Sequence, residues 1–177
     1  ENNAGYQNLM KLVSQGFLTG YYYRPRIDYN LIRQHSEGLI CLSACLSGDL
    51  PKLLLQGRYD DAEAYVREMQ DIFGEKNFYV EIMDHGIREE KIVMPRLISL
   101  AREMNVPLVA TNDCHYLEEK DADAQDVLLC IQTGKTLDDA NRMRMDTRQL
   151  YVKSEDEMRT LFAACPDAVD RTQEIAD

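Results

Sequence analysis

The chain has 177 residues, of which 45% are apolar, and it carries a formal net charge of −11 with a pI of about 4.7. This length fits one domain of ordinary size, and the apolar fraction is enough for a buried core. Domains that bind nucleic acid show basic patches, so the acidic balance excludes strong binding to a phosphate backbone by the chain alone. No apolar run approaches the roughly 18 residues that span a bilayer, so we expect no membrane association.

The N-terminus and the cysteines indicate the compartment. The opening "ENNAGYQNL" has no basic segment followed by an apolar run, so it is not a secretory signal, and its lack of Met suggests a piece of a longer protein. The five cysteines are an odd number without a C-x-x-C pair. This pattern predicts reduced thiols in a cytoplasmic protein.

The first half of the chain alternates between helical and extended patterns. The stretch "YYYRPRID" contains Pro25, which excludes a central strand there, and Gly74 stands where a helix-ending glycine belongs. In chain order we expect a helix, an aromatic loop, a buried strand, two helices and a second strand, over residues 6–18, 21–28, 38–48, 49–56, 59–73 and 77–86.

The second half continues the alternation. We expect a helix over 88–104 with a kink or restart at Pro95, a strand over 106–113 and a helix from Asp121 to about Ile131. A short strand over 149–154 follows. Ser154 with Glu157 forms a capping-box pattern that opens a helix to Phe162, and Asp167 opens the last helix.

This order of strands and helices predicts parallel pairing and an α/β fold. Three or four strands are too few to close a barrel of eight strands. We therefore expect either part of a barrel or an open sheet.

The stretch "VATNDCHY" contains the first candidate site. On an extended chain, residues two apart point to the same face, roughly 6–7 Å from each other, so Asp113 and His115 would reach into the same space past a strand end. This arrangement suits a divalent metal or half of an acid–base site. The alternative is that Asp113 caps a turn and His115 packs or faces water.

Three further residues stand near the ends of predicted strands. Cys45 shares one face of its strand with Cys41, and its thiolate would complete a soft metal site, although a small buried cysteine is more often part of the core. Glu81 and His85 lie near the end of the middle strand, where Asp84-His85-Gly86 reads better as a turn.

The remaining candidates favour structural roles. Cys114, as the odd residue of its strand, should point away from the two candidate ligands beside it. Arg24 and Arg26 could hold an anion or an acidic neighbour, although solvated surface is the simpler interpretation. The chain has no P-loop, no G-x-G-x-x-G and no G-x-S-x-G motif.

Several stretches taken together resemble one family. "GYQNLMKL", "GYYYRPRID", "EGLICLSACLSGDLP", "PLVATNDCHYL" and "DAQDVLLCIQTGKTLDD" follow one another in this order. They are similar to the polymerase-and-histidinol-phosphatase (PHP) domain of bacterial replicative polymerases, the DNA polymerase III alpha subunits. The resemblance covers essentially the whole chain.

The resemblance implies part of a distorted (β/α)7 barrel, with parallel strands alternating with helices. Residues 1–150 would be the C-terminal part of the PHP domain, and residues 151–177 a short strand and helices leading towards the polymerase palm. It also implies divalent metals (zinc, manganese or magnesium) at the strand ends. Cys45, Asp113 and His115 stand at family ligand motifs, whereas His35 and His85 match none.

The family's other ligands, beginning with its H-x-H motif, would lie upstream of Glu1. The resemblance therefore implies an incomplete ligand set and weak or absent metal binding by this chain alone. The palm carboxylates would lie downstream, so we expect no polymerase activity from the chain by itself.

The implied function is that of a segment of a DNA-directed DNA polymerase that acts in chromosomal replication. The PHP region would support the polymerase or bind a proofreading exonuclease subunit, while the sliding clamp and DNA would bind other domains. The alternative is a metal-dependent 3′–5′ exonuclease or phosphoesterase. A free-standing phosphatase is disfavoured by "LLCIQTGKT", which resembles the polymerase branch.

Overall fold

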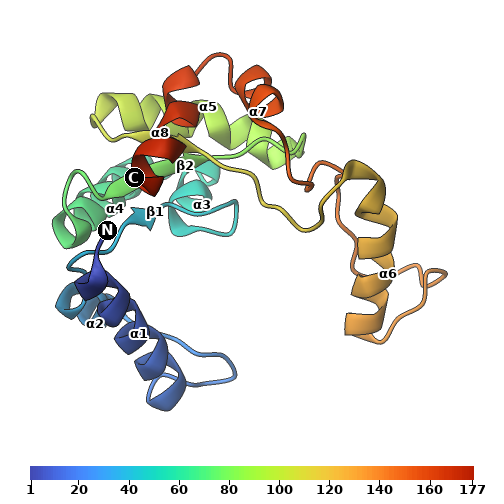
Figure 1. The fold of residues 1–177 in the computed structure, drawn as a ribbon, viewed down its shortest axis with the longest axis horizontal. Helices are drawn as coiled ribbons and strands as arrows, with labels where there is room; N and C mark the ends of the chain where they lie inside the picture. Colours follow the sequence, from blue (N-terminus) through green and yellow to red (C-terminus); the bar gives the residue numbers. More distant parts are fainter.

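Three parallel strands form the centre of the structure, a computed structural model that describes residues 1–177 (Figure 1). They are β1 (Cys41–Leu42), β2 (Phe78–Ile82) and β3 (Leu108–Ala110), in the order β1-β2-β3. Cys41 lies opposite Phe78, and Val80 lies opposite Leu108. The predicted α/β class with parallel pairing is confirmed.

Helices connect successive strands, as parallel pairing requires. Between β1 and β2 run α3 (Asp49–Leu55) and α4 (Tyr59–Phe73), and between β2 and β3 runs α5 (Arg88–Glu103). The other helices precede the sheet or follow it, and these are α1 (Asn3–Leu18), α2 (Tyr29–Gln34), α6 (Ala122–Thr133), α7 (Glu155–Leu161) and α8 (Pro166–Ala176). A 3₁₀ turn, Glu119–Asp121, leads into α6.

The hydrophobic core lies around β2, all five of whose residues are buried. A strand that is covered on both faces has no polar face, which explains the apolar run around Glu81. The buried stripe of α4 packs against this sheet through Ala62, Val66, Met69 and Ile72. The last helix and the turn before it contribute to the same core through Phe162, Cys165, Ala168 and Val169. The boundary we expect near residue 150 stays a prediction.

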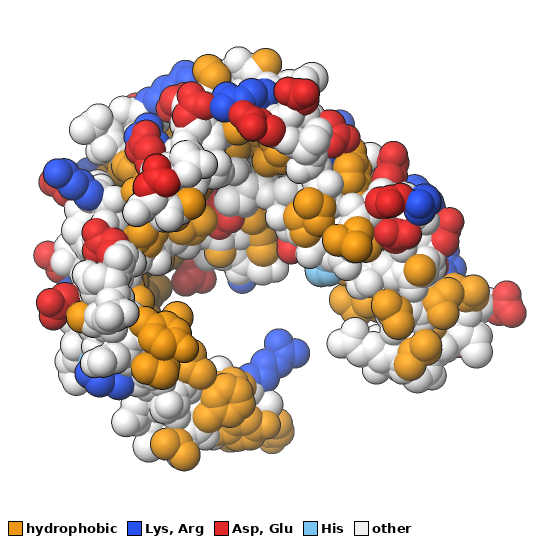
Figure 2. Space-filling model, viewed as in Figure 1, with side chains coloured by type: hydrophobic (Ala, Val, Ile, Leu, Met, Phe, Trp, Pro, Cys, Tyr) orange, Lys and Arg blue, Asp and Glu red, His pale blue; other side chains and the backbone are white.

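Two arms extend from this centre and leave an open hollow between them (Figures 1 and 2). One arm is α1 with α2 and the aromatic loop, and the other is α6 with the segment that follows it. Hydrophobic side chains gather on both arms (Figure 2). On α1 they form an exposed helical stripe of Tyr6, Leu9, Met10, Val13 and Phe17.

The arm of α1 is held to the body by close backbone contact. A side chain on Gly5 would meet the carbonyl oxygen of Gly38, which itself has a left-handed φ of 72°. Gly38 lies close to another backbone and also has a left-handed φ, and only glycine allows the two together at low cost. The buried residues of α1 are two glycines and one leucine, namely Gly5, Leu12 and Gly16.

Each predicted strand is longer than the observed one. In the first, Ala44 has a φ of 68°, a left-handed conformation that ends extended structure. The expected strand over 149–154 is wrong, because this segment makes only an isolated bridge between Tyr151 and Tyr116. Helix α2 was not among the expected elements, and it is a short helix capped by Asp28.

The sequence patterns predicted the helices more accurately than the strands. Ser154 and Glu157 form the predicted capping box at the start of α7. Helix α5 is continuous through Pro95, so there is no restart, and α8 begins at Pro166, one residue before Asp167. No helix has both the length and the apolar character needed to cross a membrane.

Candidate functional site

The carboxyl ends of the three strands meet at one edge of the sheet, as in parallel α/β folds generally. A cavity of about 220 Å³ lies beyond this edge. Its lining comes from the segments that follow each strand and from the chain after α6. Cys45, His85, Asp113, His115, Arg144 and Thr147 are among the residues that line it.

Asp113 and His115 lie together at this cavity. Oδ1 of Asp113 is 3.3 Å from Nε2 of His115. The strand ends at Ala110, so both residues belong to the segment after β3 and not to the strand itself. Both side chains are partly exposed, so the pair is open to solvent and to a ligand.

Cys45 lines the same cavity but lies elsewhere in the fold than we expected. It stands in the turn between β1 and α3, because the left-handed Ala44 takes the chain off the strand direction. The predicted alternation of Cys41 and Cys45 on one strand face is therefore wrong. Cys45 is half-buried, and it also lines a small cavity of about 20 Å³ with Glu81.

These donors do not fit a metal ion by themselves. No group of three or more His, Cys, Asp or Glu side chains in the chain is close enough to share one ion. A protein zinc site normally has three or four protein ligands at about 2.0–2.3 Å. The expectation that further ligands lie outside these residues stays a prediction.

His85 and Glu90 form a buried pair beside the cavity, with 2% and 5% of their surface exposed. Nδ1 of His85 lies 2.6 Å from Oε1 of Glu90, and the backbone N–H of His85 donates to Oε2 at 2.7 Å. Burial alone would raise the pKa of Glu90, but these hydrogen bonds and the charge interaction with His85 outweigh it and lower the pKa.

The turn that we expected at Asp84-His85-Gly86 is confirmed. Oδ1 of Asp84 accepts a hydrogen bond from the N–H of Gly86, which has a φ of 77°. The pairing of His85 with Glu90 was missed. The signal available in the sequence was an acidic residue in the first turn of a helix, five residues after a histidine.

A second polar network ties the three strand ends together. The N–H of Glu81 donates to Oγ of Ser43 at 2.9 Å, and Oγ1 of Thr111 donates to Oε1 of Glu81 at 2.5 Å. Burial, with the charge of Glu81 second, raises the pKa of the nearby Cys41 thiol to about 11. In the absence of a metal, the Cys41 thiol is therefore protonated at neutral pH, and this partly buried residue packs against the core.

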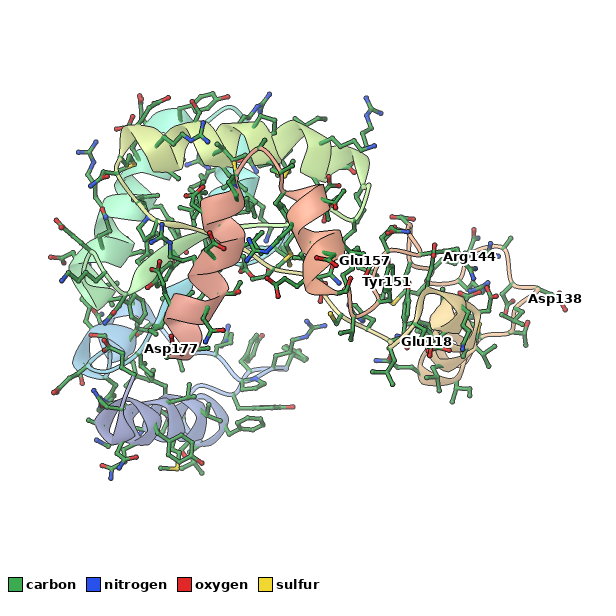
Figure 3. All side chains as sticks on the ribbon, turned by 45° about the horizontal axis from the view of Figure 1, so that its top comes forward. Glu118, Asp138, Arg144, Tyr151, Glu157 and Asp177 are labelled. Atoms are coloured by element: carbon green, nitrogen blue, oxygen red, sulfur yellow. The ribbon has the colours of Figure 1, made fainter.

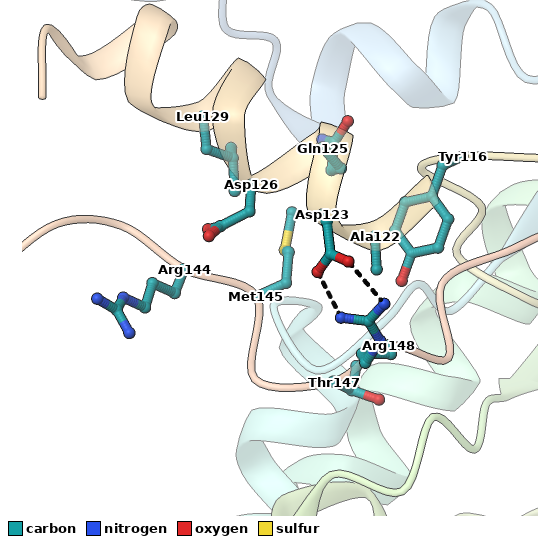
Figure 4. A pocket seen from close by; sticks show the side chains of 10 residues that line it. All are labelled: Tyr116, Ala122, Asp123, Gln125, Asp126, Leu129, Arg144, Met145, Thr147 and Arg148. Carbon is teal, nitrogen blue, oxygen red and sulfur yellow. Dashed lines mark hydrogen bonds and ion pairs between the residues drawn. The ribbon is translucent and has the colours of Figure 1, made fainter. Parts of the chain in front are cut away.

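The segment after α6 is fastened to that helix by two arginines. Arg148 makes two hydrogen bonds to Asp123, at 2.6 and 3.2 Å, beside a cavity of about 140 Å³ (Figure 4). Arg142 pairs with Asp126 through both ends of its guanidinium group. Arg144 lies between these two arginines in the sequence, pairs with no carboxylate and lines both this cavity and the strand-end cavity.

The remaining candidates do not line the strand-end cavity. Arg26 lies over the ring of Tyr22, 4.8 Å from its centre, and neither Arg24 nor Arg26 forms an ion pair. Cys114 is exposed, and its sulfur lies 3.3 Å from Nδ2 of Asn112.

Comparison with known proteins shows what the sequence of the chain is similar to. Residues 1–85 match the PHP domain. The whole chain aligns with proteins named DNA polymerase III subunit alpha, with 50% identity to that of Treponema pallidum over 99% of the chain and 46% to that of Borreliella burgdorferi over 100%. Residues 1–85 therefore carry PHP-domain sequence, and the chain along its whole length is similar to DNA polymerase III alpha subunits. The relative from Thermus aquaticus is 45% identical over 98% of the chain.

These relatives are much longer than the chain. The aligned segment makes up 15% of the alpha subunit from Treponema pallidum and 14% of that from Thermus aquaticus. The match to the PHP domain includes Cys45 and His85, whereas Asp113 and His115 lie beyond residue 85 and are covered by the whole-chain alignments.

Proposed function

We propose that this chain is a segment of the alpha subunit of a bacterial DNA polymerase III, and that its principal role there is to support the polymerase. The observation that carries this proposal is the alignment over the full chain with alpha subunits of several bacteria. DNA-directed DNA synthesis would then be the activity of the whole subunit, in which the rest of the polypeptide supplies the catalytic carboxylates.

The exposed faces of the two arms support this role. The stripe on α1 leaves large apolar side chains in solvent, including Val13 at 53% and Phe17 at 59% exposed. On α6, Leu128 and Ile131 are exposed in the same way. Large contiguous apolar faces mark interaction sites. We infer that the remainder of the alpha subunit covers them and completes a (β/α)7 barrel around β1 and β3.

The support role is tested by Val13→Asp, with Ser14→Asp as a matched control on the same helix. In the 177-residue chain both side chains are exposed, so both variants should stay within about 0.5 kcal/mol of the parent. In a full-length alpha subunit carrying this segment, Val13→Asp should lower the melting temperature and primer extension, because it buries a charge. Equal behaviour of the two variants in the full subunit would contradict the proposal.

Primer extension also distinguishes the activity of the 177-residue chain from that of the full subunit. The full subunit should extend a primed template, and the 177-residue chain should not. Template-directed incorporation by the chain alone would overturn the assignment of the chemistry to other parts of the subunit.

The second candidate is a metal-dependent phosphoesterase or 3′–5′ exonuclease centre in the intact PHP domain. It is favoured by one observation, that Cys45, Asp113 and His115 line one cavity at the strand ends. Their side chains would be three of its ligands, and further ligands would come from other parts of the subunit. Zinc, manganese or magnesium bound there would supply an activated water.

Binding of Zn²⁺ or Mn²⁺ tests this candidate. The full subunit should bind either metal more tightly than the 177-residue chain does, and Asp113→Asn should weaken that binding. Stoichiometric, chelator-resistant metal in the 177-residue chain would contradict the need for outside ligands. A proofreading exonuclease partner is a separate proposal, tested by co-purification with the full subunit.

A further inference from the structure

His85 connects the three segments that surround the strand-end cavity. Its ring and its N–H contact Glu90 of α5, and its carbonyl oxygen accepts a 2.6 Å hydrogen bond from Oγ1 of Thr147. On the far side of the ring, Nε2 lies 3.1 Å from the backbone nitrogen of Asp113. Every polar atom of His85 thus has a hydrogen-bond partner, as expected for a residue that is almost fully buried.

These contacts determine where the ring carries its proton. A backbone N–H can only donate, so Nε2 of His85 must present its lone pair to Asp113. The proton of the neutral ring therefore sits on Nδ1, which donates to the carboxylate of Glu90. Glu90 thereby selects the tautomer in which His85 can hold Asp113.

The segment after β3 depends on this contact. The last amide bonded to the neighbouring strand is that of Thr111, which donates to the carbonyl of Ile82 at 3.1 Å. Beyond it, the amide of Asp113 is held by His85 and the amide of His115 by the carbonyl of Leu150. The hydrogen bond from Asp113 to His85 therefore lies between the sheet and the Asp113–His115 pair.

We propose that His85 is a positioning residue, which with Glu90 fixes the backbone of Asp113 and so holds the Asp113–His115 pair at the cavity. Its effect on ligand binding rests on the second candidate function above, whereas its effect on the backbone does not. His85 itself binds no ligand, because both ring nitrogens are already engaged.

Two substitutions of His85 test the roles of its two ring nitrogens separately. The amide of His85→Gln reaches to the place of Nε2, so it can still accept from Asp113, while that of His85→Asn reaches only to the place of Nδ1. Hydrogen exchange of the backbone amides in the 177-residue chain reads the difference. We expect about tenfold less protection of the Asp113 amide in His85→Asn, the equivalent of one hydrogen bond, and near-parental protection in His85→Gln.

The amides of Val80 and Thr111 are the internal controls, because both are bonded within the sheet. His35→Asn is the control substitution, since the His35 side chain makes no hydrogen bond. Loss of protection at all three amides would show that His85 only stabilises the fold. Unchanged protection of Asp113 in His85→Asn would also overturn the proposal.

The tautomer gives an independent readout. Nitrogen-15 correlation spectra of the ring should show a protonated Nδ1 and an unprotonated Nε2 in the parent, and a shift towards the other tautomer in Glu90→Gln. A parent ring protonated on Nε2 would refute the arrangement. In the full subunit, His85→Asn should weaken Mn²⁺ binding about 10–100-fold, the usual effect of removing a residue that orients a ligand.

The two proposals fail in different ways. If the parent subunit binds no Mn²⁺, the phosphoesterase candidate fails, while the amide exchange and tautomer results still decide the role of His85. If the parent binds Mn²⁺ and His85→Asn binds it equally well, the positioning role fails and the metal site stands.

Discussion

The hydroxyl of Thr111 donates a 2.5 Å hydrogen bond to Oε1 of Glu81, and this bond ties the segment after β3 to the middle strand. Glu81 is buried, so its carboxylate has little water to replace a lost donor. Removing one partner of a buried polar pair costs more than the pair itself contributes. The polar network at the strand ends is therefore a sensitive point of the fold.

The first prediction follows from this bond. Thr111→Val keeps the shape of the side chain but removes the donor, and we expect it to lower the free energy of unfolding by about 1–3 kcal/mol. Urea unfolding measures the change. Thr160→Val is the control, because the Thr160 hydroxyl lies on the exposed surface of α7. Equal effects of the two substitutions would contradict the importance of the buried site.

The core around α3 makes a second prediction. Leu54 is fully buried, whereas Leu18, also near a helix end, is 80% exposed. Leu54→Ala should cost about 2–5 kcal/mol through lost burial and a residual cavity. Leu18→Ala should change stability by less than about 0.5 kcal/mol. A small effect at Leu54 in thermal or urea unfolding would mean that α3 is not packed as described.

The contacts at the start of α7 predict that the stability of the fold depends on pH. Glu157 lies near Tyr151 (Figure 3). It accepts hydrogen bonds from the hydroxyl of Tyr151 and from the N–H and hydroxyl of Ser154. These bonds, led by that of Tyr151, lower the pKa of Glu157 to about 2. A lowered folded-state pKa gives stability that is present above the ordinary pKa near 4.5 and is lost as the pH falls towards 2.

Tyr151→Phe should therefore raise the pKa of Glu157 and flatten the loss of stability between pH 4.5 and pH 2. Carboxyl carbon-13 shifts of Glu157 measure the pKa directly. Tyr59→Phe is the matched control, because Tyr59 is exposed and makes no side-chain hydrogen bond. If Tyr151→Phe leaves the titration of Glu157 where it was, the hydrogen bond does not determine that pKa.

The segment between α6 and α7 depends on its arginines. Arg142→Lys keeps the charge but loses the bidentate contact with Asp126. Residues 135–149 should therefore exchange amide protons faster, and proteases that do not cleave after lysine or arginine should cut them sooner. Arg144→Lys is the control, since Arg144 belongs to the same segment and pairs with no carboxylate. Identical cleavage rates in the two variants would show that Asp126 does not hold the segment.

The net charge makes the last prediction. At −11 the chain should bind duplex DNA weakly even at low salt, where phosphate contacts are strongest. Fluorescence anisotropy with a labelled duplex measures this. Sub-micromolar binding with a steep salt dependence would mean that a local basic surface outweighs the total charge.

Much of the fold could be predicted from local patterns. The stripe of α4 and the capping box at Ser154 are encoded by residues three or four apart, so the sequence shows them directly. The positions of Asp113 and His115 after an apolar run placed them at a strand end. The exposed stripe on α1 was seen as a helical pattern, but periodicity cannot show whether a partner covers it.

The missed features depend on contacts between distant residues. Glu90 looks like any acidic residue in a first helical turn, and only the packing of α5 against β2 and α3 buries it with His85. Ala44 adopts a left-handed backbone that its residue type rarely takes, so the turn that moves Cys45 off the strand had no sequence signal. The position of Cys45 could therefore not be derived from alternation.

The packing of α8 against β3 also bears on how the chain folds as it is made. Strand β3 forms one edge of the sheet, and α8, which covers it, is the last helix of this segment to be synthesised. Ribosomes add about 5–20 residues per second, so β3 waits for seconds in the nascent chain before α8 reaches it. During that interval Leu108 and its unpaired strand edge are open to chaperones and to neighbouring chains, and slow stretches of translation between β3 and α8 would lengthen the exposure.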